Sequence, residues 1–311
     1  MKPLKLIQLS FMALALLGFS LTGCKKDNLN QGSNDNSSVL QLSADEQAVN
    51  NAMDDAAKDA ESILSAGVTR LKSTNGWPCN ATIDSTQKVN DTITFFITYN
   101  GSNCSGNRTR TGKVEIKKAV GTHWLLPGAT VKYKYINYTI THNKTGKSIT
   151  INGTKTFTNL SGGFIWQLGA GATSIVQRIS GVMQAKFDDG STRTWNVARQ
   201  ITYTGTPGQL VMTIDGFGNA GTFDNLVTWG TNRNDEPFYT QITQSVVHKQ
   251  LCGWDPVSGI KIHQIPSKSK SATITFGYDK NTLVTGDICP TQYRVDWQRN
   301  GNSGTSYILL P

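Results

Sequence analysis

From about residue 77 to the C-terminus, the chain is a series of strand-like runs separated by turn residues, and this pattern constrains the fold most strongly. The runs are rich in Thr, Val, Ile and aromatic residues and often alternate between apolar and polar residues, as in Thr92–Tyr99, Thr130–Ile140 and Thr192–Tyr203. Turn sequences such as Asn152-Gly153 and Asp189-Gly190 are typical of hairpins. Because the links are short and contain no helical crossover, we expect antiparallel strands in a mainly β fold.

The four cysteines of this region mark a repeated unit. Each unit consists of a cysteine, a strand-like run, a second cysteine and a further run: Cys79, Thr92–Phe95, Cys104 and Val114–Ile116, then Cys252, Thr273–Gly277, Cys289 and Val295–Trp297. Of the possible pairings, the repeat favours the disulfides Cys79–Cys104 and Cys252–Cys289. A metal site is the alternative, but the spacings lack a CxxC or a paired histidine pattern. The repeat predicts two related β halves, in a sandwich or an open-barrel-like sheet.

One helix is expected before the β region. Ser43 and Glu46 have the spacing of a capping box, in which each side chain satisfies a backbone donor. Gly67 is a suitable stop. Apolar residues recur at helical spacing between them: Ala48, Val49, Ala52, Met53, Ala56, Ala57, Ala60, Ile63 and Leu64. The charged residues expected to face water are Asp54, Asp55, Lys58, Asp59 and Glu61. We expect the helix to dock on its own β region; binding of a partner is the alternative.

The N-terminal residues have the layout of a secretory signal peptide. Lys2 and Lys5 precede the apolar run Phe11–Phe19, and small residues follow. The apolar run is too short for a transmembrane helix, which needs about 20 residues. Leu21–Cys24 then resembles the lipobox of bacterial lipoproteins. The resemblance implies transfer of a diacylglycerol to the Cys24 sulfur, cleavage before Cys24 and acylation of the new amino group, which together make a stable membrane anchor.

These features divide the chain into five segments. They are a signal peptide (1–23), a lipidated flexible tether (24–42), an N-terminal helix (43–73), a first β half (74–175) and a second β half (176–311). The tether is predicted from its polar composition. Lys25 stands where aspartate retains lipoproteins in the inner membrane of enteric bacteria. The sequence therefore favours the outer membrane, at its periplasmic face or at the cell surface.

Four segments of the β region carry a resemblance to known proteins: Cys104–Ile116, Tyr135–Ile140, Ile151–Asn159 and Asp189–Asn196. They resemble a family of Bacteroidota outer-membrane lipoproteins of unknown function with duplicated cysteine-containing β units. The similarity extends over most of residues 77–301 and is lost at Phe95–Thr98, where this chain lacks the acidic run of the family. The resemblance implies no catalytic residues.

The charge is unevenly distributed along the chain. The formal net charge is +9, yet residues 24–66 hold three lysines against eight acidic residues, so the β region is strongly basic. A basic region can attract anionic partners, although a solvated β surface is the simpler interpretation. The expected extracytoplasmic location excludes nucleic acid as a partner.

The sequence contains no recognised catalytic or cofactor motif. Gly216–Gly221 matches GxGxxG, but a dinucleotide site needs a surrounding βαβ unit, so we interpret it as a glycine-rich loop. The histidines lack ligand spacing, and the acidic pairs lie beside turn residues: His123, His142, His248, His263, Asp188-Asp189 and Asp235-Glu236. We therefore expect no cofactor and no metal.

The seven tryptophans give the best indication of a function. Exposed indole rings can stack on sugars, whereas buried rings fill a β core. Trp124 and Trp166 are the candidates for ligand binding, because glycine and proline near them indicate loops. The sequence thus predicts a lipid-anchored, non-catalytic binding module for a glycan or for another envelope component, such as an envelope protein. An envelope-directed hydrolase and a purely structural lipoprotein are the alternatives.

Overall fold

The computed structural model describes residues 41–43, 45–46, 48–49, 52–53, 56, 59–60, 78–89, 91–286 and 288–310. The expected signal peptide, Cys24, almost all of the tether and the expected helix stop at Gly67 lie outside these residues. Among the described residues, no helix is long and apolar enough to cross a membrane.

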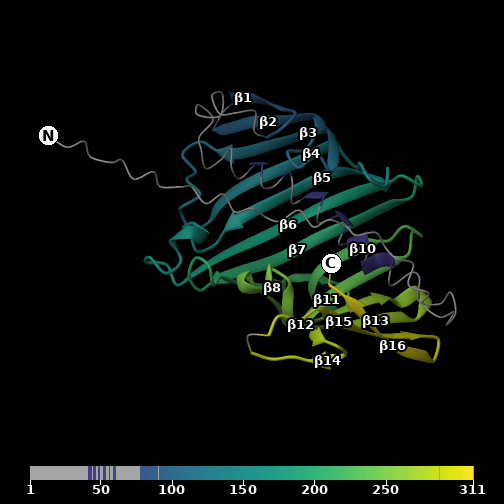
Figure 1. The fold of residues 1–311 in the computed structure, drawn as a ribbon. Coiled ribbons are helices and arrows are strands. Elements are labelled where there is room, and N and C mark those ends of the chain that lie inside the picture. The colour runs from purple at the N-terminus through teal and green to yellow at the C-terminus, as the bar shows by residue number, and fades with distance from the viewer. Residues whose placement is uncertain are drawn as a thin grey trace.

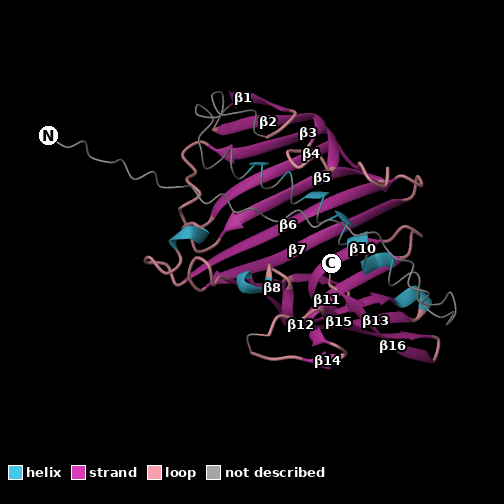
Figure 2. Cartoon of the chain, in the orientation of Figure 1, coloured by secondary structure: helices cyan, strands magenta, loops and turns pink. Residues whose placement is uncertain are grey.

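The described chain forms one antiparallel sheet of 16 strands, which confirms the predicted mainly β, antiparallel fold (Figure 1, Figure 2). Strands β1 to β7 are Ala81–Val89, Thr92–Ser102, Arg108–Ala119, Ala129–His142, Ser148–Asn159, Ser174–Phe187 and Thr192–Thr204. Strands β8 to β16 are Val211–Gly216, Gly218–Ala220, Phe223–Thr231, Pro237–Lys249, Pro256–Ile265, Lys270–Asp279, Thr282–Leu283, Gln292–Arg299 and Asn302–Leu309. The connecting segments include the short 3-10 helices η2 (Ile165–Gln167), η3 (Gln250–Cys252) and η4 (Pro266–Lys268).

Strands that are neighbours in the sheet are mostly neighbours in the sequence. The order is β1-β2-β3-β4-β5-β6-β7-β10-β11-β12-β13-β15-β16; β8 pairs with β7 and β11, β9 with β10, and β14 with β13. The predicted hairpin turn at Asp189-Gly190 joins β6 to β7. There the Ser191 amide donates to Asp189 Oδ1 at 2.9 Å, and Gly190 has a φ of 84°, which a glycine adopts without strain.

Asn152 and Gly153 do not form the turn that their sequence suggested; they lie inside β5. Opposite them, β4 contains a bulge at Asn137, which has a φ of 47°. The backbone N–H of Asn137 donates to Asn152 Oδ1 at 2.8 Å. Gly153 has a φ of 130°, and a Cβ atom there would lie 2.4 Å from the Val182 carbonyl oxygen of β6. Asn152 and Gly153 therefore allow β4, β5 and β6 to lie close together at this point. The glycine-rich segment after β8 is likewise part of the sheet, because Gly218–Ala220 is β9.

The sheet is continuous across the boundary expected between the two halves. Residues 175 and 176 lie within β6, which pairs with β5 on one side and with β7 on the other. The chain is therefore not divided into separate sheets at this position. Figure 1 shows β11 to β16 at an angle to the broad surface formed by β1 to β7.

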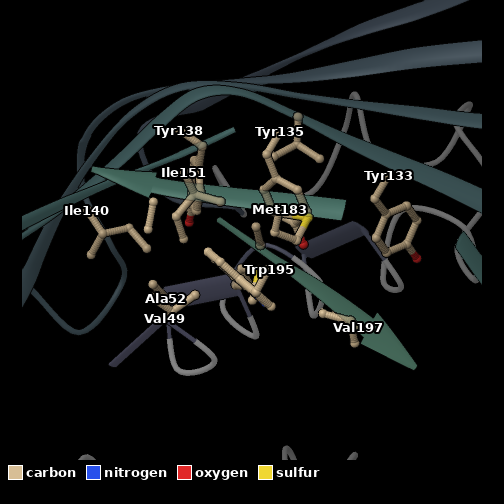
Figure 3. Close-up of a cluster of buried hydrophobic side chains, with 14 of the residues drawn as sticks. Val49, Ala52, Tyr133, Tyr135, Tyr138, Ile140, Ile151, Met183, Trp195 and Val197 are labelled. Carbon is tan, nitrogen blue, oxygen red and sulfur yellow. The ribbon is translucent and has the colours of Figure 1, made fainter. Parts of the chain in front are cut away.

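The largest hydrophobic core lies between the N-terminal helix and the sheet (Figure 3). It contains buried side chains from the helix, from β2 to β7, and from β11, β12, β13 and β15. Val49 and Ala52 of the helix belong to the same cluster as Met183 of β6 and Trp195 of β7. The helix is thus docked on the β region of its own chain.

The described residues between Gln41 and Ala60 are helical. Because the helix already includes Gln41, Ser43 lies inside it, and the predicted capping box of Ser43 and Glu46 is wrong. Ala48, expected in the apolar stripe, is exposed. Among the described members of the predicted stripe, the buried ones are Val49, Ala52, Met53, Ala56 and Ala60.

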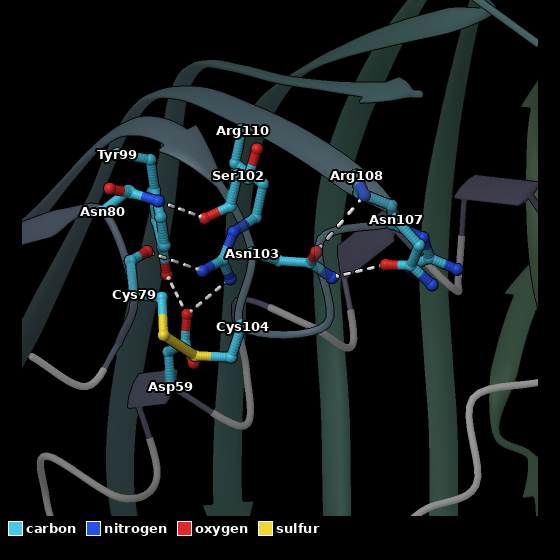
Figure 4. The surroundings of a disulfide bond; sticks show 10 residues. All are labelled: Asp59, Cys79, Asn80, Tyr99, Ser102, Asn103, Cys104, Asn107, Arg108 and Arg110. Atoms are coloured by element: carbon cyan, nitrogen blue, oxygen red, sulfur yellow. Dashed lines mark hydrogen bonds and ion pairs between the residues drawn. A yellow bond between two sulfur atoms is a disulfide. The ribbon is translucent and has the colours of Figure 1, made fainter. Parts of the chain in front are cut away.

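Asp59 was expected to face water, but it is buried against the sheet. Its Oδ2 atom lies 2.7 Å from Nη1 of Arg110 on β3 and accepts a hydrogen bond of 3.0 Å from the Tyr99 hydroxyl of β2 (Figure 4). Arg110 also donates to the carbonyl oxygen of Cys79 at 3.3 Å. The helix is therefore joined to the sheet by charge as well as by apolar contacts, beside the Cys79–Cys104 disulfide.

Both predicted disulfides, Cys79–Cys104 and Cys252–Cys289, are confirmed. Cys79 precedes β1 and Cys104 lies between β2 and β3, while Cys252 precedes β12 and Cys289 lies between β14 and β15. Each disulfide therefore connects the start of one strand of a hairpin to the segment that leaves the hairpin. The two disulfides thus have the same position relative to their hairpins.

Candidate binding surface at one end of the sheet

The longer connections of the sheet gather at one end. In an antiparallel sheet, every second connection lies at the same end of the strands. At one end the longer connections are residues 120–128, 160–173, 205–210 and 250–255, together with 280–286 and 288–291. The short turn between β1 and β2 adjoins them, because the Val120 amide donates to the carbonyl of Asp91. We call this set of segments the loop rim. It contains both tryptophans that the sequence suggested as ligand-binding residues.

The first two loops are held together by Asn159, the last residue of β5. Its side chain is completely buried, and its Nδ2 atom donates to the Trp124 carbonyl at 2.7 Å and to the Gly163 carbonyl at 2.9 Å. The Gly163 amide also donates to the Leu125 carbonyl at 2.9 Å. These bonds bring the loop of Trp124 against the loop of Trp166.

The remaining loops are joined in the same manner. Gly169 lies against Thr206, which connects loops 160–173 and 205–210. The Gln250 side-chain oxygen accepts from the amides of Gly208 and Leu210, at 2.9 and 3.1 Å. Finally, the Cys252–Cys289 disulfide ties loop 250–255 to the segment before β15. The loop rim is thus one linked surface.

Exposed apolar side chains are concentrated on the loop rim. Trp166 is 68% exposed, Leu251 65% and Leu126 54%. The full set on the rim is Val120, Leu125, Leu126, Leu160, Trp166, Leu251, Leu283 and Ile288. Leu309 adjoins them at the end of β16, because the next amide, that of Leu310, donates to the Thr291 carbonyl. Elsewhere in the described chain, the large exposed apolar residues are Val182 and Tyr307.

The opposite end of the sheet has a different character, and we call it the charged end because its turns include Lys144, Asp188, Asp189, Arg233 and Glu236. Its turns are residues 103–107, 143–147, 188–191, 232–236, 266–269 and 300–301. They contain no Val, Ile, Leu, Met, Phe, Tyr or Trp. Since both ends belong to the same sheet, the contrast reflects the sequences of the loops and is not required by the fold. Contiguous apolar surface on a folded protein marks a site of interaction.

The two tryptophan candidates have different environments. Trp166 lies on η2 and stacks on Phe164, with ring centroids 5.6 Å apart and an interplanar angle of 20°. Gln167 stabilises this turn, because its Oε1 atom accepts from the Phe164 amide at 2.8 Å. Trp124 is partly buried and packs against the main core. Trp166 is therefore available to a ligand, whereas much of Trp124 serves the core.

A second cluster of polar residues lies where the helix begins. Asp45 is buried and accepts from Nη2 and Nε of Arg233 at 2.6 and 2.8 Å. The Arg233 guanidinium also pairs with Asp189 at 3.0 Å and lies 3.4 Å from the centre of the Phe187 ring. This bidentate contact fixes the start of the helix to the turns at the charged end of the sheet.

Glu46 lies at the centre of this cluster. Its Oε1 atom is 3.5 Å from Arg199 Nη2 and 4.0 Å from Lys261 Nζ. Burial raises the pKa of Glu46, but nearby positive charges outweigh it and lower the pKa to about 2. They belong to Lys261, Arg199 and Arg193, and to His263 in acid, where its ring is protonated. Glu46 is therefore a buried carboxylate that stays ionised.

His263 was expected to be a surface or strand histidine, and it is a fully buried residue of β12. Burial lowers its pKa to about 4, and its Nδ1 atom is hydrogen bonded to the Thr240 hydroxyl at 2.8 Å. Its ring is thus neutral near pH 7. Among the described residues, no group of three or more His, Cys, Asp or Glu side chains could hold a metal ion. The cluster joins the helix to the sheet, and its central groups Asp45, Glu46 and His263 are buried.

Sequence reasoning missed both the apolar rim and the buried cluster. The leucines of the rim do carry a signal, because Leu125-Leu126 precedes Pro127-Gly128 and so lies in a turn. The cluster has no local signal, since Glu46 and Arg199 are far apart in the sequence.

In comparisons with known proteins, no family model, no curated protein and no solved structure matches this chain.

Proposed function

We propose that this protein is a lipid-anchored protein of the bacterial outer membrane, in which the β sheet is a non-catalytic binding module and the loop rim is its binding surface. The observation that carries the proposal is the concentration of exposed apolar side chains on that rim. The anchor is Cys24, whose sequence context resembles a lipobox.

Burial of apolar side chains is the contribution that favours binding through the rim. Burying one Leu or Val side chain completely contributes about 1.5–3 kcal/mol relative to leaving it exposed. The rim holds eight large apolar side chains that are 37–68% exposed, so each can contribute part of this amount. Burial of several of them together would oppose the entropy lost on association. The stacked rings of Trp166 and Phe164 also offer a flat surface to a saccharide.

The arrangement supports binding over hydrolysis. Burial raises the pKa of Asp255, but this is the one carboxyl group in the described segments of the loop rim, so a glycosidase pair is not formed there. A general acid of a glycosidase requires a carboxyl group with a raised pKa beside the substrate. Glu46 instead has a pKa of about 2 and is a buried residue of the helix. Asp188-Asp189 and Asp235-Glu236 lie in the turns at the charged end. The hydrolase alternative therefore gains no support from these groups.

The two disulfides support an origin by duplication. Each closes an equivalent unit of two hairpin strands and the segment that follows. We propose in addition that the cysteine units at 79–116 and 252–297 are related to each other, although they belong to one sheet. The strands between the two units would then join them.

Two experiments test the function. Cells fed a labelled fatty acid should label the wild-type protein and not a Cys24→Ala variant; equal labelling would refute the anchor. The purified mature chain with Cys24→Ser should bind an envelope glycan or envelope lipid through the rim. Trp166→Ala should weaken that binding, whereas Trp166→Phe should largely restore it. Turnover of a glycan without stable binding would favour the hydrolase.

A further inference from the structure

We propose that the loop rim rests on the lipid surface of the membrane that carries the Cys24 anchor, with its apolar side chains in the interfacial layer. The inference names the partner of the binding surface and rests on the function proposed above. It follows from the chemical character of the rim, from its extent and from the lengths of the chain segments outside the structure.

The loop rim carries almost no charge. Residues 120–128, 160–173 and 205–210 contain no Lys, Arg, Asp or Glu, and the other two loops contain Asp255, Lys280 and Asp287. The lysines at its border donate to loop carbonyls, Lys118 to Thr122 at 3.5 Å and Lys249 to Gly286 at 2.8 Å. The charges of the basic β region therefore lie mainly elsewhere. The interaction that the rim offers is burial of apolar area, which an acidic polymer does not provide.

The side chains of the rim suit a membrane interface. Aliphatic residues such as Leu125 and Leu126 supply apolar area for the acyl-chain boundary, and an exposed indole such as Trp166 favours the headgroup level. These residues are spread over loops that are linked in a row from 120–128 to 280–291. An extended front of this kind matches a planar surface.

The segment between the helix and β1 is too short to cover the rim. Residues 61–77 connect the region of Asp59 to the region of Cys79, and both contact Arg110 near the start of β3, at the charged end. Because both ends of this segment lie at the charged end, its 17 residues can reach at most about 30 Å from that end before they must return. The 14 residues of β6 extend about 46 Å from one end of the sheet to the other.

The tether is long enough for the proposed orientation. It reaches the described chain at Gln41, whose side chain donates to Asp45, the partner of Arg233 at the charged end. Residues 24–40 extend up to about 60 Å, which exceeds the length of the sheet. The lipid on Cys24 can therefore lie in a membrane that the loop rim touches.

The test uses the mature chain with Cys24→Ser, so that no acyl chain contributes. Binding is measured by co-sedimentation with vesicles of phosphatidylcholine alone and with vesicles that also contain phosphatidylglycerol. We expect similar binding to both and little change with added salt, because the rim holds few charged residues. The double variant Leu125→Asp/Leu126→Asp should reduce binding by about tenfold or more. Val182→Asp is the matched control, since Val182 is 57% exposed on β6 but lies off the rim, and binding should change by less than about twofold.

Each other outcome overturns the inference in a distinguishable way. Absence of vesicle binding together with binding to a glycan would refute the lipid assignment and leave the proposed binding function intact. Absence of both would refute the two together. Binding that requires phosphatidylglycerol and disappears with salt would assign the contact to the basic β surface. If Val182→Asp reduced vesicle binding as much as the rim variant does, the rim would not be the surface that contacts the lipid. Far-UV circular dichroism confirms that each variant is folded.

Discussion

Asp59 of the N-terminal helix and Arg110 of β3 form a buried ion pair, with Oδ2 and Nη1 separated by 2.7 Å and both side chains less than a tenth exposed. The two residues are 51 positions apart in the sequence. The Tyr99 hydroxyl donates to the same carboxylate oxygen. Through this contact the helix is connected to β2 and β3, which flank Cys104 of the first disulfide.

Breaking this ion pair should destabilise the protein strongly. Asp59→Ala leaves the Arg110 guanidinium buried without its carboxylate, and loss of one partner of such a pair costs about 3–5 kcal/mol. The double variant Asp59→Leu with Arg110→Met should recover much of this loss, because no charge then remains buried. Urea unfolding of the three proteins measures the effect. Equal stability of Asp59→Ala and the parent would show that the pair contributes nothing.

The two disulfides should stabilise the sheet by similar amounts. Their cysteines are 25 and 37 residues apart, so each should contribute about 3–4 kcal/mol through the entropy of the unfolded chain. Thermal unfolding of the Cys79→Ala/Cys104→Ala and Cys252→Ala/Cys289→Ala variants compares them. Peptide mapping without reductant checks the pairing itself. A peptide that links Cys79 or Cys104 to Cys252 or Cys289 would contradict it.

Acid should destabilise the protein in two steps. The folded-state pKa of His263 is about 4 against 6.5 for the free group, so the unfolded state binds the proton first and stability falls as the pH decreases from 6.5 to 4. The folded-state pKa of Glu46 is about 2 against 4.5, so stability falls further between pH 4.5 and 2.

Two variants separate these steps. His263→Gln should flatten the dependence of unfolding free energy on pH between 4 and 6.5, and Glu46→Gln should flatten it between 2 and 4.5. The slope is measured by urea unfolding at each pH, so a uniform loss of stability does not hide the effect. An unchanged slope in His263→Gln would show that another group titrates in that window.

The close approach of strands at Gly153 gives a further prediction. Gly153→Ala should destabilise by more than Gly190→Ala, although both glycines have a positive φ. At Gly190 nothing lies within 4 Å of the added Cβ atom, and the cost is about 1–2 kcal/mol for the backbone alone. At Gly153 the Cβ atom also meets the Val182 carbonyl oxygen at 2.4 Å. Equal losses would indicate that β6 moves away freely.

Features with a local cause could be predicted from the sequence. The hairpin at Asp189-Gly190 follows from the conformational freedom of glycine, and the disulfide pairs follow from a repeated order of cysteines and strand-like runs. Asn152 and Gly153 show the limit, because the same turn residues serve a bulge that depends on Asn137 of the neighbouring strand.

Features with a distant cause could not be predicted. Asp59 looked like a water-facing residue because its partner Arg110 lies in a strand whose position relative to the helix is set by the whole sheet. The cluster around Glu46 and His263 depends on contacts between the helix, β7 and β12 in the same way. The loop rim was missed for another reason, since a single exposed leucine in a loop has no meaning until the loops are placed side by side.

The most direct test of the binding surface is hydrogen–deuterium exchange of the acylated protein on vesicles, compared with the Cys24→Ser chain in solution. We predict slower exchange on the membrane in residues 120–128, 160–173 and 250–255, with no change in the turns 143–147, 188–191 and 232–236. Slower exchange confined to those turns, or none in the loop rim, would contradict the assignment of the rim as the surface that meets the envelope.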